Sequence, residues 1–143
     1  MTTSFALQNL GWNADPNVPE PTVELEGNDL LLSFKLNAFL YPQFAEGATG
    51  KVRFLQCWRH RLGPTNDEGW YLGQCRFSRR APAWGEFYEV AGDLLLQARP
   101  LSWSVSGAEP LQSRHYLFYF RDETFECDAQ SFQIHLPHHG GGA

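Results

Sequence analysis

Apolar and polar residues alternate over short stretches through most of the chain, and clusters of turn-forming residues separate these stretches. The segment "TVELEG" (22–27) alternates, "GND" (27–29) turns the chain and "LLLSFKL" (30–36) follows, which predicts a hairpin. No window keeps a helical period, and in "NAFLYPQFAEGATG" (37–50) Pro42 and the glycines restrict a helix to about one turn. With about eight to ten short strands in all, the pattern predicts an all-β fold. We expect an antiparallel β-sandwich, jelly-roll or immunoglobulin-like, with at most one or two short helical turns.

The clearest alternation lies in "HYLFYFRDETFECDA" (115–129), which predicts a hairpin with two chemically different faces. If Phe120 and Phe125 flank the turn, Phe118 lies opposite Cys127, and the strand continues through "FECDAQSFQIHL" (125–136). One face is then apolar and belongs to the core. The other face carries Glu126 and Asp128, and we expect it to be solvated because solvent-facing strand positions are normally polar.

The segment "KVRFLQCWRHRL" (51–62) is predicted to form one strand with a basic face. Its apolar face holds Val52, Phe54, Trp58 and Leu62, and its basic face holds Lys51, Arg53, Arg59 and Arg61. Residues 51–80 contain seven basic and two acidic residues, in a chain whose formal net charge is −5. Arginine suits bidentate contacts with carboxylates or phosphates. Two hypotheses follow: the arginines pair with Glu126 and Asp128, which the cost of crowding like charges favours, or they remain free for an anion or an acidic partner.

Length and composition limit the class of protein. The 143 residues fit a single domain, which we place at residues 1–136, and "PHHGGGA" (137–143) reads as a flexible tail. The acidic net charge argues against a general nucleic-acid binder, and no apolar run is long enough for a membrane span. Three cysteines without a secretory signal predict reduced thiols and a cytoplasmic protein. If Leu62 and Trp70 flank a hairpin loop, Cys57 and Cys75 are opposed but reduced.

Catalytic and metal chemistry find little support in the sequence. The one Cys-x-x-His spacing, Cys57 and His60, places the two side chains on opposite faces of a strand, so we predict no metal site and no cofactor. Glu126 and Asp128 would lie about 7 Å apart on a strand, which is within the range of glycosidase carboxylate pairs. Further acids stand at Glu86, Glu89 and Asp93.

Aromatic side chains offer a possible stacking platform for a sugar. The candidates are Trp12, Trp58, Trp70, Trp84, Trp103, Tyr41, Tyr71 and Tyr88. Core packing is the favoured interpretation for this set, since aromatic residues dominate core energetics. Trp84, in the turn-like "RRAPAWGEF" (79–87), is the best candidate for exposure.

We therefore predict a non-enzymatic binding domain that recognises a protein partner or a small anionic ligand. Its site residues would be Arg53, Arg59, Arg61 and Trp84. One alternative is a carbohydrate-binding sandwich that uses exposed Trp and Tyr rings. Another is a hydrolase or isomerase with a carboxylate pair, which requires the acids to share a deep pocket. The sequence leaves homo-oligomerisation undecided.

Overall fold

The computed structural model describes residues 4–64, 85–92, 103–120 and 123–137, and these residues form ten strands and no helix. The strands are β1 (Ser4–Leu7), β2 (Thr22–Glu26), β3 (Asp29–Lys35), β4 (Thr49–Leu55), β5 (Arg59–Pro64), β6 (Phe87–Ala91), β7 (Ser104–Val105), β8 (Arg114–Tyr119), β9 (Glu123–Ala129) and β10 (Ser131–His135). The expected tail lies outside the described residues apart from Pro137. No helix in the described ranges could cross a membrane.

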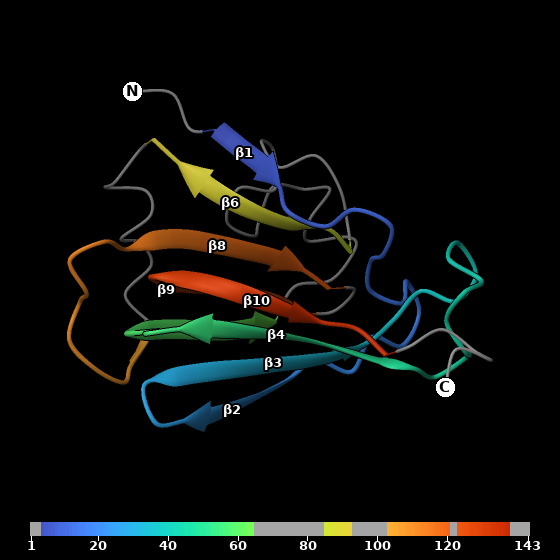
Figure 1. The fold of residues 1–143 in the computed structure, drawn as a ribbon, viewed down its shortest axis with the longest axis horizontal. Helices are drawn as coiled ribbons and strands as arrows, with labels where there is room; N and C mark the ends of the chain where they lie inside the picture. Colours follow the sequence, from blue (N-terminus) through green and yellow to red (C-terminus); the bar gives the residue numbers. More distant parts are fainter. Residues whose placement is uncertain (1–3, 65–84, 93–102, 121–122, 138–143) are drawn as a thin grey trace.

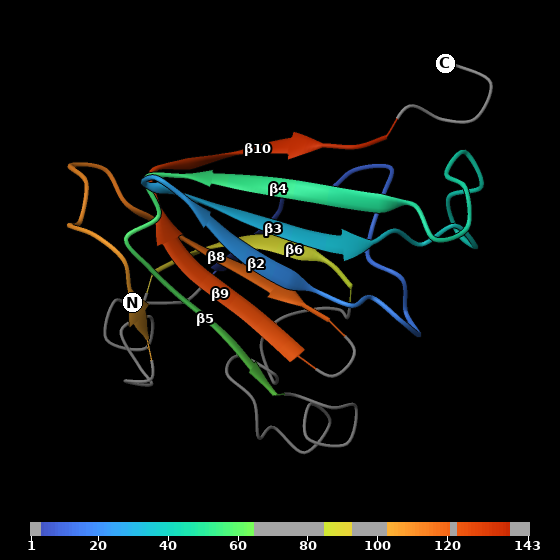
Figure 2. The ribbon, with the colours of Figure 1, turned by 90° about the horizontal axis from the view of Figure 1, so that it is seen from below.

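Two antiparallel sheets pack together as a sandwich, which confirms the predicted fold class. One sheet has six strands in the order β1-β6-β8-β9-β5-β7, and the other has four in the order β10-β4-β3-β2 (Figure 1). Figure 2 shows the two layers from below, with β10, β4 and β3 above β8, β9 and β5.

The hairpin of β2 and β3 forms as predicted. Glu26 pairs with Asp29 across a two-residue turn. Gly27 opens this turn with a φ of 62°, a left-handed conformation that glycine adopts without steric cost. The alternation in β3 then directs Leu30, Leu32 and Phe34 into the core, while intervening residues are half-buried.

The hairpin of β8 and β9 has the predicted faces, but its register differs by two residues. Phe118 pairs with Phe125, and Tyr116 pairs with Cys127. The turn is tighter than expected because the Phe120 amide donates to the carbonyl of Glu123 over 2.8 Å. A shift of two residues leaves every side chain on its original face, so the apolar face still enters the core.

Two predicted single strands are wrong, because the chain changes sheets within each of them. Residues 51–62 break after Leu55, where Gln56 has a φ of 49°, and β4 and β5 belong to different sheets. Residues 125–136 break at Gln130, between β9 and β10. The two corners lie side by side, since the Gln130 amide donates to the Leu55 carbonyl over 2.9 Å and the Trp58 amide to the Asp128 carbonyl over 3.0 Å.

Aromatic side chains fill the core between the sheets. The fully buried rings of this core cluster are Phe34, Phe54, Phe87, Tyr116, Phe118, Phe120 and Phe125. Phe118 stacks on Phe120 with ring centroids 4.3 Å apart, and Phe54 meets Phe87 edge-on at 5.8 Å. Such pairs stabilise a core beyond their buried area. The inner face of the six-stranded sheet packs against the core. Its outer face carries charged residues of β5, β8 and β9.

Candidate functional site

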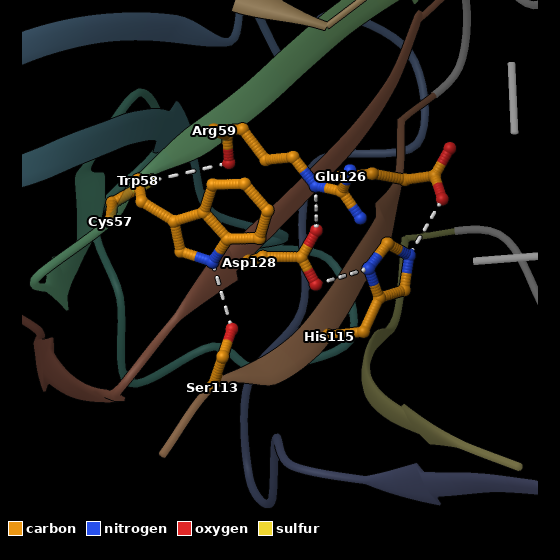
Figure 3. Close-up of polar contacts among 7 residues, drawn as sticks. All are labelled: Cys57, Trp58, Arg59, Ser113, His115, Glu126 and Asp128. Atoms are coloured by element: carbon orange, nitrogen blue, oxygen red, sulfur yellow. Dashed lines mark hydrogen bonds and ion pairs between the residues drawn. The ribbon is translucent and has the colours of Figure 1, made fainter. Parts of the chain in front are cut away.

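A row of five charged side chains crosses three neighbouring strands on the outer face of the six-stranded sheet. The strand register places Arg59 opposite Asp128 and Arg61 opposite Glu126. Arg59 Nε donates to Asp128 Oδ2 over 2.5 Å, and Arg61 Nη1 donates to Glu126 Oε2 over 3.1 Å. His115 from β8 lies between the two carboxylates, with Nδ1 and Nε2 each 2.9 Å from a carboxylate oxygen of Asp128 and Glu126 (Figure 3). We call these five residues the charged row.

Two tryptophans enclose one end of the charged row. The guanidinium carbon of Arg59 lies 4.5 Å from the ring centroid of Trp58 and 4.6 Å from that of Trp103. Trp58 is fixed in turn, because its Nε1–H donates to Ser113 Oγ over 2.9 Å (Figure 3). Cation–π contacts with these two rings stabilise a cation that also pairs with Asp128.

The protonation states follow from the contacts. Ionised carboxylates only accept hydrogen bonds, so both ring nitrogens of His115 must donate when Asp128 and Glu126 are charged. Burial lowers the pKa of His115, but the hydrogen bonds and charges of the two carboxylates outweigh burial and raise it. Burial favours a higher pKa for Asp128, but the contacts with His115 and Arg59 outweigh burial and lower this pKa. The row therefore alternates positive and negative charges.

This arrangement decides between the two hypotheses for the arginines and corrects one expectation. Internal pairing is confirmed for Arg59 and Arg61, so these residues do not form a free basic face. The expectation of a solvated acidic face is wrong, since the side chain of Glu126 is 0% exposed and that of Asp128 is 8% exposed. Both carboxylates are engaged by the arginines and by His115.

Arg53 does not join the charged row. Arg53 lies in the four-stranded sheet, where it pairs with Glu26 and, over 3.5 Å, with Asp29. The corner at Gln56 explains this separation, because it ends the common face that residues 51–62 were predicted to share. Trp84 lies outside the described residues.

A second feature is a pocket of about 430 Å³ beside β1 and β6. The described residues that line it are Phe5, Leu7, Asn9, Leu10, Gly11, Tyr41, Glu86 and Tyr88. Its volume lies within the usual range for small-molecule sites, about 300–1,000 Å³. Its lining is also typical, with mostly apolar and aromatic residues around a few polar groups. In the paired strands β1 and β6, Leu7 lies opposite Tyr88.

The polar side of the pocket is built by two asparagines around Glu86. The Asn9 amide nitrogen donates to the Trp12 carbonyl over 2.8 Å and to Glu86 Oε2, and its oxygen accepts the Phe87 amide over 2.9 Å. Asn13 Nδ2 donates to Glu86 Oε1 over 2.9 Å. Both carboxylate oxygens of Glu86 are therefore held in place by neutral donors.

A separate loop brings Tyr41 to the pocket. The Tyr41 amide donates to the Asn37 carbonyl over 3.1 Å, and the Asn37 side chain caps the same turn by accepting the Phe39 amide over 3.1 Å. Gln43 Nε2 then donates to the carbonyl of Gly11 over 3.1 Å, which ties this loop to the chain after β1. The pocket thus combines three segments that are distant in the sequence.

The stacking platform that the sequence offered as an alternative is not found among the described tryptophans. Trp12 is buried in the core, while Trp58 and Trp103 contact Arg59. The other two, Trp70 and Trp84, lie outside the described residues. Sequence reasoning had singled out Tyr41, Tyr88 and Glu86 separately, but it missed Phe5, Leu7, Asn9 and Leu10. The polar, glycine-containing "QNLGWN" (8–13) was the one available sign of a structured turn there.

The described residues contain no group of three or more His, Cys, Asp or Glu side chains placed to hold a metal ion. Cys57 and Cys127 are free and buried. Burial raises the pKa of the Cys127 thiol well above its ordinary value, and the neighbouring Cys57 raises it further. The predicted partner Cys75 lies outside the described residues, so its pairing with Cys57 stays a prediction.

Comparison with protein families, with curated proteins and with solved structures finds no match to this chain.

Proposed function

We propose that this protein is a non-enzymatic binding domain that holds a small saccharide in the pocket beside β1 and β6. The observation that carries the proposal is the joining of aromatic rings with a fixed carboxylate in one cavity of about 430 Å³. A sugar ring has an apolar C–H face that packs on an aromatic ring, and its hydroxyls donate hydrogen bonds. Tyr41 supplies such a ring, and the Glu86 carboxylate supplies acceptors for the hydroxyls.

The carbohydrate hypothesis now has better support than an anionic ligand at the arginines. Arg59 and Arg61 are engaged by buried carboxylates, and Arg53 by Glu26 and Asp29. An anion at these arginines would meet the negative charge of the carboxylates that already pair with them. A saccharide in the pocket beside β1 and β6 does not compete with an existing ion pair of this kind.

The test is a saccharide titration of the wild-type protein and two variants. Saturation-transfer NMR with a panel of mono- and disaccharides should detect binding to the wild type. Tyr41→Ala should weaken binding about two- to twelvefold, since an aromatic contact contributes roughly 0.5–1.5 kcal/mol. Phe39→Ala is the matched control, because Phe39 is 77% exposed on the same loop and does not line the pocket. Absence of binding across the panel, or equal losses in both variants, would contradict the proposal.

We also propose a cytoplasmic location, supported by the free thiols of Cys57 and Cys127, which a reducing compartment preserves. Fractionation of the source cells with thiol-specific labelling of the denatured protein tests it. Recovery in an oxidising compartment with disulfide-bonded cysteines would contradict it.

A further inference from the structure

Glu86 is the one charged group among the described residues that line the pocket, and none of those residues is a lysine, arginine or histidine. The hydrogen bonds to its half-buried carboxylate come from the neutral amides of Asn9 and Asn13. The buried Asp128, by contrast, meets Arg59. Among the residues that the structure describes, no cation is paired with Glu86.

Building on the saccharide function above, we propose that the pocket selects an amino sugar whose protonated amine binds Glu86. An ionised carboxylate offers about four acceptor sites. Asn9 and Asn13 occupy one site on each oxygen, which leaves acceptor capacity for a ligand. A protonated amine matches this capacity in both charge and hydrogen bonding, since it carries up to three donors.

The rest of the pocket agrees with a cationic ligand. Aromatic faces attract a cation that lies within about 6 Å of the ring centroid, and Phe5, Tyr41 and Tyr88 all line the pocket. A sugar phosphate or uronic acid would instead bring its negative charge toward Glu86. A neutral sugar would leave that charge without a counter-charge. The ligand class is therefore an amino sugar with a free amine.

The experiment is an NMR titration of the ¹⁵N-labelled protein at pH 6, where the sugar amine is protonated. The probes are glucosamine and galactosamine, their parent sugars glucose and galactose, and the N-acetyl derivatives, in which acetylation removes the charge. A hydrogen bond between charged groups is roughly twice as strong as one between neutral groups. At least one amino sugar should therefore bind about tenfold more tightly than its parent sugar, and its N-acetyl derivative should bind no better than the parent.

Two variants assign this preference to one carboxylate. Glu86→Gln should reduce the preference for the amino sugar below about twofold, because the loss is a charge-assisted hydrogen bond. Glu89→Gln is the matched control and should keep the full preference. Glu89 lies in β6, pairs with Arg114 over 3.6 Å and does not line the pocket.

Each outcome has a distinct meaning. Equal affinities for amino sugar and parent sugar overturn the inference and leave the saccharide function standing. A preference that survives Glu86→Gln, or that the N-acetyl derivative shares, overturns it too. No binding by any probe contradicts the proposed function itself and the inference with it. If Glu86→Gln does not fold, the wild-type comparison of the amine with its N-acetyl derivative decides, and equal affinities overturn the inference.

Discussion

Replacing Glu126 by glutamine perturbs the centre of the charged row without changing its shape. Glutamine is nearly isosteric with glutamate, so no cavity forms. The change removes the negative charge that faces Arg61 Nη1 at 3.1 Å and His115 Nε2 at 2.9 Å. It also places an amide in a site where the side chain is 0% exposed. Two positive groups then lose a buried counter-charge.

The size of the effect follows from this burial. Removing one partner of a buried ion pair costs about 3–5 kcal/mol. Because the side chain of Arg61 is 20% exposed and keeps some hydration, we expect the lower end, about 3 kcal/mol. With a urea m-value of about 1.5–2 kcal/mol/M, the unfolding midpoint should fall by about 1.5–2 M.

The assay is urea unfolding at pH 6, followed by tryptophan fluorescence, with Arg61→Gln and the double variant measured in parallel. The double variant should be more stable than the two single losses predict, with a coupling free energy of about 1–3 kcal/mol. Glu24→Gln is the control on the exposed strand β2 and should change little. A loss below about 1 kcal/mol for Glu126→Gln, or additive single losses, would refute the assignment of a buried, coupled pair.

Two further predictions concern pH and the first hairpin. The folded-state pKa of His115 is raised above 6.5 and that of Asp128 is lowered below 3.8, so the urea midpoint should be highest between these pH values. The urea midpoint should fall as the pH rises through the folded-state pKa of His115, and also as the pH drops through the folded-state pKa of Asp128. His115→Asn should remove the fall at high pH. An unchanged pH profile in this variant would contradict the prediction. Gly27→Ala should cost about 1–2 kcal/mol in thermal unfolding because it forces alanine to a positive φ. Gly107→Ala should not lower the stability, although an added Cβ meets open space at both glycines, because only Gly27 has a positive φ. Equal losses of stability in the two variants would refute the role of the positive φ.

The sequence predicted what depends on local alternation. The period of two assigned the correct faces in β3 and in the β8–β9 hairpin, because a strand buried on one side fixes side-chain direction even when the register is shifted. The register itself depends on turn length, and the sequence did not distinguish a turn flanked by Phe120 and Phe125 from the tighter one.

The sequence could not show where a strand leaves its sheet. Apolar alternation continues on both sides of Gln56 and Gln130, so nothing local marked the two corners. The charged row depends on which strands are neighbours, and strand order is a long-range property. The same complementary charges would fit an exposed face or a buried one, and for this reason the burial of Glu126 was missed.

The pocket was still harder to predict. Its residues come from β1 and the turn after it, from the loop at Tyr41 and from the start of β6. Each segment alone is unremarkable in composition. The pocket arises from hydrogen bonds between segments, such as Gln43 to Gly11 and Asn13 to Glu86, which no sequence period encodes.

The most direct test of the central claim is a crystal structure of the protein soaked with the tightest-binding amino sugar of the titration. We expect a sugar ring packed against Tyr41, with its amine nitrogen within about 2.7–2.9 Å of a Glu86 carboxylate oxygen. An empty pocket in a crystal that binds the sugar elsewhere, or a sugar in the pocket with its amine directed away from Glu86, would contradict it.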